Sequence, residues 1–312
     1  MTLQEYIASL RGKTVAVIGI GVSNTPLLRL LLREGIAVTA CDRSDRAKLG
    51  ALAEELEAAV EETKRLAREG YREIVINGIE ISSWGWEWKD GSRLPQLLLS
   101  VCEAAPDVRI RLGSLEPRTI DEEFCTMLSA CKNLCPQFHL SLQSGSDTVL
   151  KRMNRKYDTT RYLESVRLLH EHFPNCAVTT DLIVGFPGET EQEFSDSLSF
   201  MQTCRLAAVH VFPYSRRKGT PAASMPDQIE KSEKERRAAL AGEVAAKLHN
   251  AFLTRQIGTD HDVLFEQTEK GYFTGHTMNY VKVYCDAADL RNEIRRVRVT
   301  KLFEDGVLAE LI

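Results

Sequence analysis

The stretch TDLIVGFPGETEQEF, residues 180–194, contains the signals that decide the predicted fold. The apolar run at residues 182–184 is typical of a short strand buried on both faces. Gly-Phe-Pro-Gly then breaks the strand, and Thr190 with Glu193 three residues later predicts the capping box of a helix. Asp181 is a carboxylate within the apolar strand, so it is a candidate ligand group or the cap of a neighbouring backbone group.

The same alternation of strand and helix extends over most of the chain. Strands are predicted at residues 15–19, 37–41, 73–77, 108–112, 138–142, 178–184 and 208–212. Helices are predicted at residues 24–33, 46–68, 94–104, 122–131, 160–172 and 191–203. This pattern predicts an α/β fold with parallel strands, in a doubly wound sheet or an incomplete barrel. In both, ligands bind at the C-terminal ends of the strands.

The pattern changes after Pro226. Asp227 and Glu230 form a second predicted capping pair, which opens a long helix that runs towards Gln256. Five short strands are predicted after it, at residues 261–265, 271–276, 280–285, 294–300 and 306–311. Short strands separated by turn residues indicate a small antiparallel β-barrel.

Composition narrows the class of protein. The chain has 312 residues, 43% of them hydrophobic, and a formal net charge of −4, so a nucleic-acid partner would need local basic patches. The first residues lack a signal-peptide core, and no apolar run approaches the length of a membrane span. The eight cysteines then indicate free or metal-bound thiols in a reducing compartment. We therefore predict a cytoplasmic protein without a membrane partner, and no obligate protein partner is inferred.

A glycine loop follows the first predicted strand. Gly19, Gly21, Ser23 and Asn24 stand between that strand and the next helix, where backbone amides can hold a phosphate. Asp42 ends the second strand at the spacing of a ribose-binding acid. The third glycine of the dinucleotide pattern is absent, so a tight turn without a ligand is the alternative.

The run GKTVAVIGIGVSNTPLLRLLLREGIAVTACDRSDRAKLG resembles the N-terminus of UDP-N-acetylmuramoylalanine–D-glutamate ligases. The resemblance covers residues 1–56 and implies a Rossmann-like βαβ fragment that grips a UDP-sugar. The rest of that family's pattern is not found, and the sequence contains no G-x-x-x-x-G-K-[ST] loop for ATP. Ligase activity is therefore not expected.

From about residue 58 the chain resembles the radical SAM tRNA methylthiotransferases, of the type that acts on N6-threonylcarbamoyladenosine. The matching pieces occur in family order: GYREIVINGIEISSWG, RIRLGSLEP, FHLSLQSGSDTVLKRMNRKY, TDLIVGFPGETEQEF and VHVFPYSRRKGTPAASMPDQ. The resemblance implies an incomplete radical-SAM-type (β/α) barrel over residues 57–226, a linking helix over 227–257 and a TRAM-like β-barrel over 258–312. It also implies S-adenosyl-L-methionine (SAM) and a 4Fe–4S cluster as cofactors, and tRNA, at an adenosine of the anticodon loop, as partner.

Polar residues follow successive predicted strands, on the edge where a (β/α) barrel builds its site. By resemblance, this rim would hold the methionine and ribose portions of SAM. The candidate cofactor-binding residues are Ser114, Glu116, Gln143, Ser144, Asp181 and Glu189. The alternative for each residue taken alone is a loop cap.

Three basic clusters fit phosphate contacts on RNA, with Tyr157, Tyr214 and Tyr280 nearby for base stacking. The alternative for any one cluster is an ordinary solvated surface. The candidate RNA-binding residues are Arg152, Arg155, Arg216, Arg217, Arg296 and Arg298.

The cysteines do not follow the family pattern. A radical SAM enzyme holds its cluster with a C-x-x-x-C-x-x-C loop, and thiolates suit iron because they are soft donors. That motif does not occur among Cys41, Cys102, Cys125, Cys131, Cys135, Cys176, Cys204 and Cys285. Cys131 and Cys135 form a C-x-x-x-C pair without the third cysteine, and we expect both to pack as small hydrophobes. No metal ligand is predicted.

Three hypotheses follow. The first is a fusion of a ligase-like fragment with a methylthiotransferase that lacks its cluster-binding parts, in which the strand at residues 37–41 takes the place of the first barrel strand. Such a protein would bind tRNA and, weakly, SAM, with impaired catalysis. The second is an active methylthiotransferase with unusual cluster ligands. The third is a nucleotide-binding module that uses the glycine loop.

Overall fold

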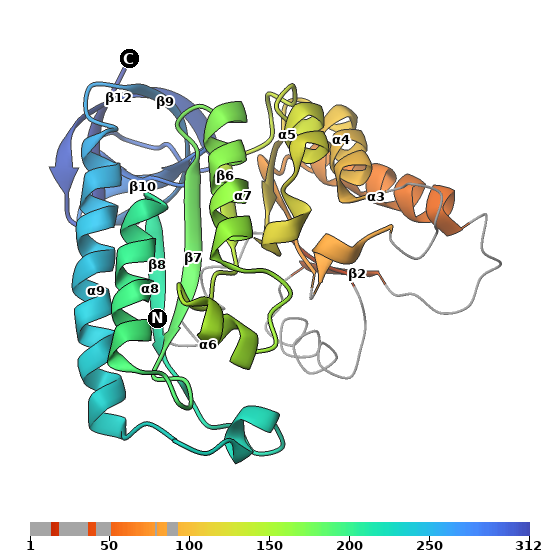
Figure 1. Ribbon diagram of the computed structural model, residues 1–312. Coiled ribbons are helices and arrows are strands. Elements are labelled where there is room, and N and C mark those ends of the chain that lie inside the picture. Colours follow the sequence, from red (N-terminus) through yellow and green to blue (C-terminus); the bar gives the residue numbers. More distant parts are fainter. Residues whose placement is uncertain (1–13, 19–36, 42–50, 79, 86–92) are drawn as a thin grey trace.

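The computed structural model describes residues 14–18, 37–41, 51–78, 80–85 and 93–312. Two four-stranded parallel sheets are followed by a closed β-barrel, which lies at one end of the sheets (Figure 1). The first sheet has the order β2-β1-β3-β4, built from β1 (Thr14–Ile18), β2 (Ala37–Cys41), β3 (Glu73–Ile76) and β4 (Arg109–Leu112). The second has the order β5-β6-β7-β8, built from β5 (Ser114–Leu115), β6 (Gln137–Leu140), β7 (Ala177–Val184) and β8 (Ala208–Pro213).

The predicted parallel strands are confirmed, but the place of the first two differs from the expectation. The strand next to β3 is β1, through the pair Val15↔Val75, and β2 forms the outer edge of the sheet. The prediction that residues 37–41 take the place of the first strand of the (β/α) barrel is therefore wrong, because β1 lies between them and β3. The reason is that β1 pairs on both edges, with β2 on one side and β3 on the other.

Helices cover one face of the sheets (Figure 1). They are α3 (Ala51–Arg68), α4 (Leu94–Ala104), α5 (Glu122–Leu128), α6 (Asp147–Arg152), α7 (Thr159–His172), α8 (Glu191–Thr203) and α9 (Lys231–Thr254). Short 3₁₀ turns lie at Ile81–Ser83, Pro117–Thr119 and Pro221–Ser224. The core beneath the helices includes Ile110, Phe138, Leu140, Val178 and Leu182, at alternate strand positions. Because side chains alternate along a strand, the intervening residues point to the opposite, inner face.

The two predicted helix starts have different outcomes. Thr190 caps α8 as predicted. Its Oγ1 accepts from Glu193 N at 3.2 Å, and the Glu193 carboxylate accepts from Thr190 N. The start predicted at Asp227 is wrong, because α9 begins at Lys231. Asp227 instead has φ of 55° and its carbonyl accepts from Gly188 N, so its backbone contacts the turn that follows β7.

The C-terminal barrel consists of β9 (Asp260–Glu269), β10 (Tyr272–Thr277), β11 (Lys282–Cys285), β12 (Glu293–Phe303) and β13 (Gly306–Leu311). It closes in the order β10-β11-β13-β12-β9 around a core that includes Val263, Phe265, Val283 and Val299. Four of the strand pairs are antiparallel, as predicted, but β11 and β13 are parallel. The difference arises because β12 pairs with β9 and β13 instead of with β11, its predecessor in the chain.

Candidate functional site

The inner face of the second sheet carries a polar cluster of His139, Asp181 and His210. His139 Nε2 lies 3.5 Å from Asp181 Oδ2, and the rings of His139 and His210 are 6.1 Å apart. The strand register brings these side chains together, because His139 of β6 pairs with Thr179 of β7, and Asp181 of β7 pairs with His210 of β8. Thr179 Oγ1 contacts His139 Nδ1 at 3.1 Å and so fixes the orientation of the imidazole.

Asp181 is the acidic member of this cluster. Burial tends to raise the pKa of its carboxyl, but the hydrogen bond from His139 and the charges of both imidazoles outweigh that effect and lower the pKa. The side chain keeps 33% of its surface exposed. An ionised, half-buried and accessible carboxylate can bind a cationic or N–H donor group of a ligand.

The turn after β6 holds the next two predicted residues in different ways. Gln143 has φ of 68°, its N–H donates to Asp181 O and its carbonyl accepts from Ile183 N, so its backbone is fixed beside β7. Ser144 is fully buried, and its Oγ lies 3.3 Å from Ser197 Oγ of α8. The side chain of Ser144 therefore contacts α8 in this structure.

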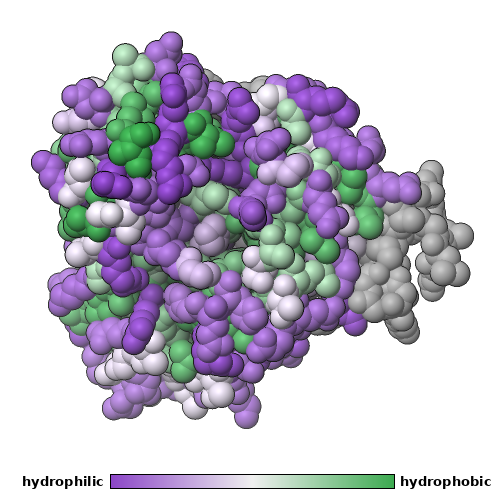
Figure 2. Space-filling model, turned by 90° about the horizontal axis from the view of Figure 1, so that it is seen from above, coloured by the Kyte–Doolittle hydropathy of each residue, from purple (hydrophilic) through white to green (hydrophobic). Residues whose placement is uncertain are grey.

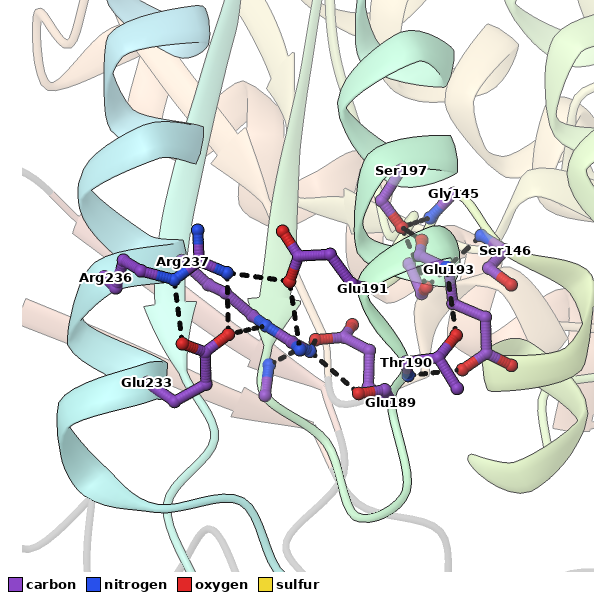
Figure 3. A network of polar contacts seen from close by, with 12 residues as sticks. Gly145, Ser146, Glu189, Thr190, Glu191, Glu193, Ser197, Glu233, Arg236 and Arg237 are labelled. Carbon is purple, nitrogen blue, oxygen red and sulfur yellow. Dashed lines mark hydrogen bonds and ion pairs between the residues drawn. The ribbon is translucent and has the colours of Figure 1, made fainter.

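Glu189 stabilises the turn after β7 (Figure 3). Its carboxylate accepts from Gly185 N at 2.6 Å and from Arg237 Nη1 of α9 at 2.8 Å, and its side chain is only 1% exposed. Burial raises the pKa of this carboxyl, although Gly185 N–H and Arg237 act in the opposite direction. The Glu189 carboxylate therefore already has hydrogen-bond partners within the protein.

Ser114 and Glu116 lie at the start and just beyond the end of β5. Ser114 is exposed. The Glu116 carboxylate is paired with Arg118 at 2.6 Å, and the backbone N–H of Glu116 donates to Ser82 Oγ. Of the six predicted cofactor residues, Asp181 and Ser114 are therefore the most open, and the binding role of all six stays a prediction.

A buried hydroxyl at the rim fits a small-molecule ligand. Tyr214 directly follows β8, and its N–H donates to Val184 O at 2.8 Å. Tyr214 Oη is buried and has no hydrogen-bond partner in the described part of the chain. Because a buried, unpaired hydroxyl is costly, a polar group of a ligand beside it would stabilise the site.

The cysteines do not fit a 4Fe–4S cluster. Seven of them have side chains that the structure describes, all as free thiols and six of them buried. Burial raises the pKa of each, that of Cys135 to about 12, whereas iron binds the thiolate. Within the described residues, no group of three His, Cys, Asp or Glu side chains could hold a metal ion. Of the C-x-x-x-C pair, Cys135 is buried as predicted, whereas Cys131 is only partly buried against the core.

The basic residues predicted to bind RNA differ in their partners. Arg152 forms a two-pronged ion pair with Glu193, and on the C-terminal barrel Arg296 and Arg298 pair with Asp262 and Asp260 of the neighbouring strand. The remaining three, Arg155, Arg216 and Arg217, are exposed. Tyr280 is 48% exposed, as stacking on RNA would require.

Tyr157 is not available for such stacking. It is buried, and its hydroxyl donates to the carbonyl of Ser141. The glycine loop of Gly19, Gly21, Ser23 and Asn24, together with Asp42, lies outside the described residues.

Two arginines of β4, which sequence reasoning missed, join the first sheet to the C-terminal barrel. Arg109 donates to the carbonyls of Asp262 and His276, at 2.7 and 3.0 Å. Arg111 donates to Met278 O at 3.1 Å and pairs with Glu73 at 2.7 Å. The alternation of Arg and apolar residues in RIRL was the available signal. The barrel therefore covers the N-terminal ends of the strands, opposite the predicted rim.

Glu193 makes the stability of the fold depend on pH in a testable way. Hydrogen bonds from Arg152, Thr148 and Thr190 N lower its pKa to about 2, against the effect of burial. A carboxyl with a lowered pKa stabilises the fold above about pH 4.3 and loses that contribution as pH falls towards its folded value. Glu193→Gln keeps the capping box and is expected to lower the free energy of unfolding by about 1–2 kcal/mol at pH 7.

Urea unfolding of Glu193→Gln and the parent protein at pH 7 and near pH 2 measures this difference. We expect the two proteins to converge at the lower pH. An equal difference at both pH values would contradict the charge-based explanation and indicate altered packing.

The sequence matches the Radical SAM superfamily over residues 39–201. It is 36% identical over 255 residues to the threonylcarbamoyladenosine tRNA methylthiotransferase MtaB of Thermotoga maritima, covering 81% of this chain and 58% of that protein. It is 35% identical over 248 residues to the tRNA-2-methylthio-N(6)-dimethylallyladenosine synthase of Acetivibrio thermocellus, covering 77% and 51%. The chain thus spans just over half the length of these relatives.

A solved structure of coproporphyrinogen III oxidase from Escherichia coli, described as a radical SAM enzyme, aligns with 95% of this chain and 68% of its own. The TM-score is 0.48 and the sequence identity 13%. None of the described helices has an apolar stretch long enough to cross a bilayer. The match over residues 39–201 extends from within β2 to within α8 and includes His139 and Asp181. On the basis of this match, the chain belongs to the radical SAM superfamily.

Proposed function

We propose that this chain is a cytoplasmic protein of the tRNA methylthiotransferase type. In this proposal it binds tRNA at an anticodon-loop adenosine, the site of N6-threonylcarbamoyladenosine, and holds SAM at the C-terminal ends of β6–β8. The observation that carries the proposal is the polar cluster of Asp181, His139 and His210 on the inner face of the sheet. The names of the relatives support the choice of tRNA.

The residues of this chain would act on SAM by binding and orientation. The Asp181 carboxylate would accept the ammonium group, because it is ionised and accessible. His139 would keep that carboxylate in place, and Tyr214 Oη would bond to a polar group of the ligand. Next to a reducing cluster, one SAM molecule would supply a radical, and a separate SAM molecule would supply the methyl group.

We also propose that the chain by itself is impaired in catalysis. This part rests on the cysteines, which lack the C-x-x-x-C-x-x-C spacing. Binding of tRNA without catalysis is then the second candidate function, and the buried, proton-bearing thiols favour it.

Calorimetric titration with SAM tests the binding site. Asp181→Asn removes the charge with little change of shape and is expected to weaken SAM binding about 10- to 100-fold, the loss of one charge-assisted hydrogen bond. Asp196→Asn, on the exposed side of α8, is the matched control and should bind as the parent does. Equal affinity of the parent and Asp181→Asn would contradict the site.

Anaerobic reconstitution with iron and sulfide, followed by visible absorption, tests the catalytic part. We expect no 4Fe–4S absorption and no cleavage of SAM. A bound cluster that cleaves SAM would overturn the proposed impairment and leave the binding site in place. Failure of the parent chain to bind tRNA in a filter assay would overturn the proposed partner.

A further inference from the structure

A groove of about 400 Å³ lies between the end of α3 and the loop that leads from α4 into β4. It opens at the end of the sheets that the C-terminal barrel covers, and that end of the molecule is largely hydrophilic (Figure 2). Its lining contains three cations, Lys64, Arg68 and Arg72, but only one acid, Asp107. Tyr71, which is partly buried, supplies an aromatic surface.

Two of the three cations form no ion pair within the described ranges, although the charge of Arg68 contributes to lowering the pKa of Glu61. Arg68 and Arg72 are exposed, and neither forms an ion pair with a residue in the described ranges. Arg65, on the same helix, is instead bound by Glu62 and Glu69. Unpaired cations in a concave surface concentrate positive potential, which attracts a polyanion.

The groove adjoins the basic strand of the C-terminal barrel through Arg109. The N–H of Arg109 donates to Arg72 O at 2.9 Å, and its guanidinium donates to Asp262 O at 2.7 Å. The Asp262 side chain in turn pairs with Arg296. Buried Arg109 therefore links the backbone of Arg72, at the groove, to the strand of the C-terminal barrel that pairs with Arg296.

We propose that this groove binds the sugar–phosphate backbone of tRNA and is a contact region in addition to the basic strand of the C-terminal barrel. The inference rests on the proposed tRNA-binding function and adds a contact region on the radical SAM part of the chain. Phosphates would contact Arg68 and Arg72, whose guanidinium groups suit phosphate geometry. Such contacts fix the position of the RNA and do not read its sequence.

The double variant Arg68→Glu/Arg72→Glu in the full chain tests the groove. Its matched control is Lys231→Glu/Lys247→Glu, which makes the same change of net charge on exposed positions of α9, on the opposite side of the molecule from α3 (Figure 1). Filter binding of tRNA over a range of salt concentrations gives the affinity and its salt dependence. Circular dichroism checks that both variants are folded.

We expect the groove variant to bind tRNA about tenfold more weakly or worse at low salt. The slope of log affinity against log salt should also be shallower by about 1.4–1.8, because each of the two lost phosphate contacts removes about 0.7–0.9. The control should keep the parent slope. If the parent binds tRNA and the two variants have the same affinity and salt slope, the groove is not a contact region, although the proposed function stands. If the parent does not bind tRNA, the proposed function itself fails.

Discussion

Replacing Arg111 with alanine is expected to lower the free energy of unfolding by about 3–5 kcal/mol, because the change leaves a largely buried carboxylate without its partner. The Arg111 and Glu73 side chains are 5% and 18% exposed and pair at 2.7 Å. Arg111 also donates to Met278 O and lies 4.6 Å from the centre of the Tyr280 ring. The variant therefore also weakens the contact between the sheet and the C-terminal barrel.

Urea unfolding followed by circular dichroism measures this loss. Arg65→Ala is the control, because Arg65 also pairs with glutamates but is exposed, and it should cost less than about 1 kcal/mol. The double variant Arg111→Met/Glu73→Leu removes both charges and should recover much of the stability. Equal losses for Arg111→Ala and Arg65→Ala would contradict the importance of the buried pair.

Replacing Arg237 with alanine is expected to cost a similar amount, about 3–5 kcal/mol at pH 7. Its guanidinium is 6% exposed and bonds to both the carboxylate and the carbonyl of Glu189 (Figure 3). Without Arg237, the buried Glu189 carboxylate keeps the hydrogen bond from Gly185 N–H but loses its cationic partner. Burial already raises the pKa of Glu189, so the folded variant takes up a proton more readily than the unfolded chain. The loss should therefore be smaller at pH 5 than at pH 7.

Arg236→Ala provides a matched control one residue away. Arg236 pairs with Glu191 and Glu233 on the surface and is 45% exposed, so its removal should cost less than about 1 kcal/mol. Thermal or urea unfolding at the two pH values compares the variants. A loss for Arg237→Ala that does not change between pH 7 and pH 5 would contradict the role given to the Glu189 charge.

Local signals determined most of the elements in advance. Thr190 and Glu193 predict the start of α8 correctly, because a capping box involves residues only three positions apart. The apolar runs predict β6, β7 and β8 correctly, but the expected burial of residues 182–184 on both faces is wrong, because burial alternates along β7. Asp227 failed as a cap since its backbone is held by a contact with Gly188, which no local pattern reveals.

The sequence by itself determined the α/β alternation, the five strands of the C-terminal barrel and the presence of Asp181 in a buried strand. The tertiary structure alone decided which partners these residues meet. Strand register brings His139 and His210 to Asp181, and α9 brings Arg237 to Glu189. Arg111 meets Met278 across 167 positions of the chain. Helices and turns depend on near neighbours, whereas buried charges are stabilised by groups that only the packed fold brings within hydrogen-bonding distance.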